Sequence, residues 1–154
     1  MDIVLAFDIE RSGGTAKYDT IALGASVLNS EFEELDSLFV PNYFPSESKF
    51  EKKCWDEFWC KQKDQLELLK YDGPLSKDAQ EKEMVEQFQC FRKKWEIYAC
   101  ENEFTFTLAS DNNVFDGGFM NDLIYKHFPD VYPIPYLAST QEYPQPYSNT
   151  RNRY

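Results

Sequence analysis

A continuous run of apolar residues lies near the start of the chain, at residues 3–7. Such a run is typical of a strand that is buried on both faces in the middle of a sheet. Two further apolar segments, residues 20–28 and 32–40, are separated by the turn-forming pair Asn29 and Ser30. The pattern therefore predicts a central strand with an antiparallel hairpin beside it.

Apolar residues at helical spacing dominate the second half of the chain. After a predicted N-cap at Ser76 they recur at steps of four and three, as one buried helix face requires: Met84, Phe88, Phe91, Trp95 and Tyr98. A strand over residues 104–108 and a helix over residues 115–127 follow. This order predicts an α/β domain in which helices flank a mixed central sheet and the first strand is central.

A segment rich in aromatic residues separates the hairpin from the long helix. Trp55, Phe58 and Trp59 are spaced for one face of a short helix, and Leu66 and Leu69 for a second helix. Aromatic side chains can stack on nucleobases, but packing in a core is the more common use of such a stripe. We therefore expect the three aromatic residues to be packed.

The composition sets the number of domains. With 154 residues, of which 42% are hydrophobic and 17% aromatic, the chain has enough bulky side chains for one compact core. We expect a single domain over residues 1–130. Residues 131–154 contain four prolines and no sustained hydrophobic period, so an extended or disordered tail is predicted there.

The formal net charge of −11 excludes a surface that is basic throughout, as binders of anionic membranes have. A local nucleic-acid site is compatible with this charge. No segment has the pattern of a signal peptide or a membrane span, and the four cysteines form no C-x-x-C pair. We expect reduced thiols, with Cys90 and Cys100 buried as small hydrophobic residues, and a cytoplasmic protein with no membrane partner.

Acidic residues follow the two strands that should lie in the middle of the sheet. Asp8 and Glu10 stand two apart at the carboxyl end of the first strand, so their side chains leave the same face. Asp116 lies just inside the helix after the later strand, where an open sheet brings it to the same edge. Such a group of carboxylates can bind Mg²⁺ or Mn²⁺, but solvated acids at strand ends are equally common in so acidic a chain.

Two short stretches resemble the motifs of a known family. Residues 6–10, Ala-Phe-Asp-Ile-Glu, are similar to the first motif of DEDD-type 3′–5′ exonucleases, the DnaQ-like group with an RNase H-like fold. Residues 110–119 resemble the second motif at four positions: Asn112, Phe115, Asp116 and Phe119. The resemblance covers roughly residues 3–128, and the stretch 55–59, Trp-Asp-Glu-Phe-Trp, is similar to exonuclease-like proteins of large DNA viruses.

The resemblance implies a metal-dependent hydrolase that acts on DNA or RNA 3′ ends, in the host cytoplasm if the chain is viral. Three residues would be both catalytic residues and ligands of two Mg²⁺ or Mn²⁺ ions: Asp8, Glu10 and Asp116. Ser12, Gly13 and Asn112 would contact the substrate, since glycine allows a close approach of the backbone. For Asn112 we favour the alternative of a residue that hydrogen-bonds its own backbone at the helix entry.

The third motif of the family has no counterpart in this sequence. It reads His-x4-Asp or Tyr-x3-Asp on a final helix, whereas His127 and Asp130 are three apart and Tyr125 and Asp130 are five apart. The 38 residues after Asp116 are also few for the family's final strand and helix. The chain is therefore either a truncated exonuclease or a degenerate relative. The alternative function is a non-catalytic RNase H-like module that binds a protein or nucleic-acid partner.

Three further expectations follow from the departure at the third motif. We expect His127 to end its helix, where an imidazolium favours the helix dipole. A domain without its final strand and helix would expose apolar surface, so the isolated chain is expected to form a homodimer or to aggregate. An incomplete carboxylate set also predicts little or no exonuclease activity for the chain as it stands.

Overall fold

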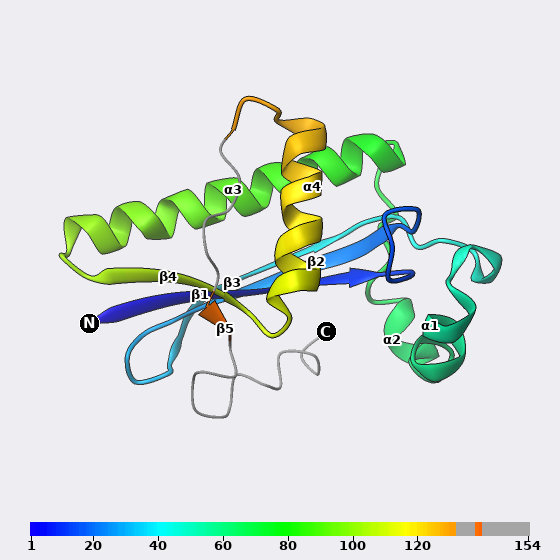
Figure 1. Cartoon of the computed structure of the whole chain (residues 1–154), viewed down its shortest axis with the longest axis horizontal. Coiled ribbons are helices and arrows are strands. Elements are labelled where there is room, and N and C mark those ends of the chain that lie inside the picture. Colours follow the sequence, from blue (N-terminus) through cyan, green and yellow to red (C-terminus); the bar gives the residue numbers. More distant parts are fainter. Residues whose placement is uncertain (132–137, 140–154) are drawn as a thin grey trace.

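The computed structural model describes residues 1–131 and 138–139. Within them, five strands form one sheet in the order β3-β2-β1-β4-β5 (Figure 1). The strands are β1 (Asp2–Arg11), β2 (Thr20–Leu28), β3 (Glu34–Pro41), β4 (Thr105–Ser110) and the two-residue β5 (Ala138–Ser139). β1 pairs antiparallel with β2 and parallel with β4, and β5 also runs parallel to β4. The predicted mixed sheet with the first strand at its centre is confirmed.

Strand β1 is buried over residues 3–9, which is why its sequence lacks the alternation of a half-exposed strand. The hairpin of β2 and β3 lies beside it, as predicted. β3 begins at Glu34, later than the predicted residue 32, because the turn extends through Phe32. The backbone of Phe32 has a φ of 64°, in the left-handed region, and a strand cannot continue through that conformation.

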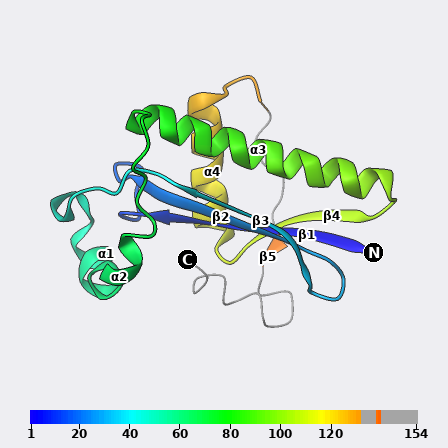
Figure 2. The ribbon, with the colours of Figure 1, turned by 180° about the vertical axis from the view of Figure 1, so that it is seen from behind.

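Two helices cover one face of the sheet (Figures 1 and 2). The long helix α3 (Lys77–Glu101) begins at the predicted N-cap, where Ser76 Oγ accepts a hydrogen bond from the Ala79 N–H at 3.2 Å. The helix α4 (Gly118–His127) packs against α3 and continues a π-helical turn, η3 (Asn113–Gly117). The main core lies between these helices and the sheet, and on α3 it includes Met84, Val85, Phe88, Trp95 and Ala99.

Some side chains of α3 differ from the prediction. Tyr98 is 42% exposed, with its ring packed edge-on against Trp95 rather than buried in the core. Cys90 and Cys100 are exposed, so the prediction that they are buried is wrong. Both lie away from the helix face that packs on the sheet, so their side chains remain in contact with solvent. All four cysteines are free, in agreement with the expected thiols.

A smaller helical unit lies at one end of the sheet, on the side opposite α3 (Figures 1 and 2). It consists of α1 (Lys52–Glu57), η2 (Trp59–Lys61) and α2 (Lys63–Leu66). Its apolar cluster joins the start of β2 and contains Ile21, Ala22, Phe50, Trp59, Leu66 and Leu69. The predicted packing holds for Trp59, which is 3% exposed, and in part for Trp55. It is wrong for Phe58, which is 40% exposed because α1 ends just before it.

Strand β5 lies beyond the predicted end of the domain. It pairs parallel with β4 within the stretch that was expected to be an extended tail, and its two residues carry too little pattern to be recognised in the sequence. Residues 132–137 and 140–154 of the predicted tail lie outside the described residues. No helix in residues 1–131 is long and apolar enough to cross a membrane.

Candidate active site

Three carboxylates meet where β4 ends beside β1. The two strands run parallel in a register that pairs Ala6 with Ala109. Asp8 and Asp111 each lie two residues beyond this pair, so they reach the same edge of the sheet on the same face. Asp116 joins them, and one carboxylate oxygen from each of the three lies within 4.8 Å of the other two.

Asp116 enters this group from the π-helical turn η3, directly after β4. Its side chain is 1% exposed. Oδ1 accepts a hydrogen bond from the Ile9 N–H of β1 at 3.4 Å, and Oδ2 accepts one from the Asn112 N–H at 3.3 Å. The Asn112 side chain caps the same turn by accepting from the Phe115 N–H at 3.2 Å, as predicted for a residue at the helix entry.

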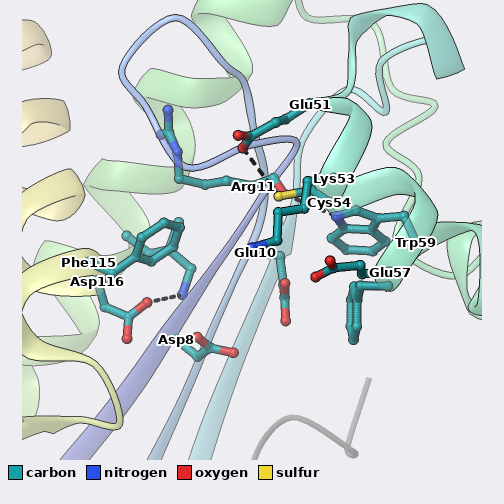
Figure 3. A pocket seen from close by; sticks show the side chains of 12 residues that line it. Asp8, Glu10, Arg11, Glu51, Lys53, Cys54, Glu57, Trp59, Phe115 and Asp116 are labelled. Atoms are coloured by element: carbon teal, nitrogen blue, oxygen red, sulfur yellow. Dashed lines mark hydrogen bonds between the residues drawn. The ribbon is translucent and has the colours of Figure 1, made fainter.

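The electrostatic environment makes ionisation of Asp116 costly. Burial, followed by the negative charges of Asp8 and Asp111, raises the pKa of Asp116 to about 8. A guanidinium stands close by in the sequence, at Arg11, but it points away from the acids (Figure 3). Its two terminal nitrogens donate to Thr20 Oγ1 at 2.8 Å and to the Tyr18 carbonyl at 2.6 Å. Arg11 therefore fixes the loop after β1 instead of neutralising the carboxylates.

Glu10 lies in the same pocket but outside the group of three. It follows Asp8 on the same face of β1, about 7 Å further along the strand, since each residue of a strand advances about 3.3 Å. Figure 3 shows Asp8 and Asp116 on the β4 side and Glu10 nearer to α1. The predicted set of Asp8, Glu10 and Asp116 is thus brought into one pocket, while the tightest group replaces Glu10 by Asp111.

The structure does not bring the predicted substrate-binding residues Ser12 and Gly13 into the pocket. Ser12 Oγ accepts from the Asp19 N–H at 2.9 Å, and the Ser12 carbonyl accepts from the Glu51 N–H at 2.8 Å. At Gly13 a Cβ would lie 2.3 Å from the Tyr18 ring, so this glycine is required by packing within the loop. A substrate contact of either residue stays a prediction.

The pocket has a volume of about 490 Å³ and joins the sheet edge to the small helical unit. Strand β1 and the turn η3 supply one side, with the three acids Asp8, Glu10 and Asp116. The residues before and within α1 supply the other side, with Glu51, Lys53, Cys54 and Glu57 and, just after α1, Phe58 and Trp59. A hydrogen bond from the Gly14 N–H, at 2.8 Å, is the main cause that lowers the pKa of Glu51.

Asp111 is the acidic residue that the sequence reasoning missed. In the sequence it is the first residue of the polar stretch Asp-Asn-Asn between a strand and a helix, which is typical of a loop. The signal that could have found it is the parallel register of β4 on β1. The register pairs Ala6 with Ala109, and β4 ends at Ser110. Asp111, the next residue, therefore lies beside Asp8.

His127 ends α4, as predicted, and takes no part in the acid pocket. Its Nε2 lies 2.8 Å from Glu81 Oε1 on α3, and Lys126 Nζ lies 2.6 Å from the same oxygen. With Asp78 these groups form a second cluster at the opposite end of α4 from Asp116. The cluster joins α4 to the first turns of α3 and so stabilises the packing of the two helices.

No protein-family model and no curated protein matches the chain. Among solved structures it is similar to E. coli exonuclease I in complex with a 5cy-dA13 oligonucleotide, with a TM-score of 0.50 and 13% identity over 83% of this chain and 25% of that one. The same enzyme in complex with a dT13 oligonucleotide gives a TM-score of 0.51 and 14% identity over 83% of this chain and 24% of that one. An ExoI/SSB-Ct complex gives a TM-score of 0.51 and 14% identity over 82% and 24%.

The likeness to these structures concerns the fold. The chain has the α/β, RNase H-like architecture, with a mixed sheet flanked by helices, that the sequence predicted. It spans about a quarter of the length of the solved chains. Activity and substrate are therefore to be argued from the pocket itself.

Proposed function

We propose that this chain is a metal-dependent exonuclease domain that hydrolyses phosphodiester bonds at the 3′ ends of nucleic acids. The observation that carries the proposal is the meeting of Asp8, Asp111 and Asp116 oxygens within 4.8 Å, beside an open pocket that Asp8 and Asp116 line. The resemblance of residues 6–10 and 110–119 to two exonuclease motifs supports it. The fold supports it as well, since exonuclease I, which shares it, is a nuclease solved with oligonucleotides.

The donor set fits a hard divalent cation. All three side chains offer oxygen, which Mg²⁺ and Mn²⁺ prefer, and they offer no sulfur or imidazole. Asp8, Asp111 and Asp116 would hold such an ion, with Glu10 further along the same pocket. When bound, divalent cations supply activation of water and neutralise the charge that develops on the leaving oxygen.

The chain's own groups orient these ligands. The Ile9 and Asn112 N–H groups both point at Asp116 and favour its ionised form, in which it can bind a cation. The pocket volume lies within the range of about 300–1,000 Å³ that is usual for small-ligand sites, which suits the end of a strand. The expectation of little or no exonuclease activity depends on an incomplete set of carboxylates. Because Asp111 adds a carboxylate, we propose a competent site.

The test is a nuclease assay on oligonucleotides labelled at the 5′ end, as single and double strands of both DNA and RNA. With Mg²⁺ or Mn²⁺ we expect a ladder of labelled products that shorten stepwise from the 3′ end, and none with EDTA. Asp8→Asn should abolish the ladder. Asp72→Asn is the matched control, because it removes the same charge from an exposed side chain outside the pocket.

The possible results distinguish the direction of digestion, and they distinguish an enzyme from a binding module. Release of the label in the first product would indicate digestion from the 5′ end and contradict the proposed polarity. Binding of oligonucleotides without any turnover in either metal would favour the alternative, a non-catalytic binding module. A ladder that Asp8→Asn leaves unchanged would come from a contaminating nuclease and would count against the site.

A further inference from the structure

One aromatic ring of the small helical unit is left exposed at the acid pocket. Phe50 and Trp59 are 7% and 3% exposed, whereas Phe58 is 40% exposed and lines the pocket together with Asp8 and Asp116. Its ring meets Trp59 edge-on, with the ring centroids 4.9 Å apart. The unit thus buries Phe50 and Trp59, buries Trp55 in part, and presents the Phe58 ring beside the carboxylates.

The residues around the exposed ring are hydrogen-bonded to the end of β1. Trp59 Nε1 donates to the Arg11 carbonyl at 3.1 Å, and the Glu51 N–H donates to the Ser12 carbonyl at 2.8 Å. Both acceptors follow Glu10 directly in the chain. Phe58 packs on Trp59, which is hydrogen-bonded to the residue after Glu10, so its ring is preorganised for a ligand that also reaches the acids.

The charges around Phe58 select the part of a nucleotide that can lie there. Glu51, Lys53 and Glu57 line this side of the pocket, and Arg11, which also lines it, points away from the acids (Figure 3). A phosphate would meet two carboxylates on this wall, whereas an uncharged base would meet the ring. Stacking of a base on an aromatic ring tolerates every base, because each has a π-face.

We infer that Phe58 is the stacking platform for the terminal base of an unpaired nucleic-acid strand whose last phosphodiester lies at the carboxylates. This inference rests on the proposed function and adds the substrate class, since a paired terminal base would bring its partner strand into the same pocket, whereas an unpaired base can meet the ring alone. Phe58 contacts the substrate away from the reacting bond. It therefore determines binding of the strand end.

The experiment compares two fluorescein-labelled DNA decamers, one with a normal 3′-terminal thymidine and one with an abasic residue in that place. Binding is measured by fluorescence anisotropy, with Ca²⁺ in place of Mg²⁺ to keep turnover low. Phe58→Ala should weaken binding of the normal decamer roughly tenfold and leave the abasic decamer within twofold of wild type. Phe58→Tyr, which keeps an aromatic face, should bind both decamers as wild type does.

Tyr98→Ala is the matched control, because Tyr98 is an aromatic residue of similar exposure, 42%, near the end of α3, far from α1 (Figure 1). It should bind both decamers as wild type does. Equal weakening of both decamers by Phe58→Ala, or no weakening at all, would overturn the stacking role while the nuclease ladder leaves the proposed function standing. A wild-type chain that binds neither decamer and produces no ladder would overturn both.

Discussion

Replacing Asp116 by asparagine tests the electrostatic cost of the acid pocket in the metal-free protein. In the folded chain, burial and the charges of Asp8 and Asp111 raise the pKa of Asp116 from 3.8 to about 8. The native state therefore holds one more proton than the unfolded state between about pH 4 and pH 8. This contribution to stability is present in full below pH 4 and is lost as the pH rises through 8.

The magnitude follows from the linkage relation. One bound proton of difference changes the free energy of unfolding by about 1.4 kcal/mol per pH unit. Between pH 5 and pH 7 the wild-type chain should lose about 3 kcal/mol through Asp116. That is a large part of the roughly 5–15 kcal/mol by which domains are stable. The Asp116→Asn variant has no titrating group at this position, so the loss should be missing in it.

The assay is urea unfolding in EDTA at pH 5, 6 and 7, followed by tryptophan fluorescence. The quantity of interest is the difference in unfolding free energy between wild type and Asp116→Asn, because other titrating groups cancel in it. Asp36→Asn is the control: the hydrogen bond from Lys94 is the main cause that lowers the pKa of Asp36, so its contribution is lost only at more acidic pH. A difference between wild type and Asp116→Asn that is the same at all three pH values would refute the reasoning.

Further predictions concern the metal site, the loop after β1 and the assembly. Asp111→Asn should weaken Mn²⁺ binding in calorimetry by at least tenfold, because even the loss of a group that only orients a metal ligand has about this effect. An unchanged affinity would show that Asp111 is not part of the metal site. Gly13→Ala should destabilise the chain by about 1–3 kcal/mol in urea, because its Cβ would lie 2.3 Å from the Tyr18 ring. Trp59→Phe should cost about 1 kcal/mol, because the Arg11 carbonyl loses its donor. Self-association stays a prediction, which sedimentation of the purified chain checks: a stable monomer at micromolar concentration would contradict it.

The elements that the sequence predicts best are those with a strong hydrophobic period. β1 could be recognised because residues 3–9 are buried on both sides, and α3 because its core positions recur at helical spacing. Phe58 could not be placed in this way. Its exposure depends on where α1 ends and on the contact of Trp59 with the Arg11 carbonyl, 48 residues earlier in the chain.

In the site, too, the residues found from the sequence are those that stand in a local pattern. Asp8 and Asp116 could be found because each sits at a strand or helix end in a motif-like stretch. Asp111 could not, since its place beside Asp8 comes from the pairing of β4 with β1 and not from any local pattern. Glu10 was expected at the same point as Asp8. The rise of the strand between them puts it further along the pocket.

The cost of burying Asp116 is itself an argument about what the pocket is for. Asp116 is 1% exposed, and its pKa is raised to about 8, so at neutral pH the folded chain must keep a proton on Asp116 that the unfolded chain releases, which costs stability. The fold does not need that charge, because an amide could accept the same hydrogen bond from the Ile9 N–H. A divalent cation would remove the repulsion among Asp8, Asp111 and Asp116 and convert a destabilising group into a ligand. Addition of Mn²⁺ at pH 7 should therefore stabilise the wild-type chain more than Asp116→Asn, and equal stabilisation of the two would show that the ion binds elsewhere.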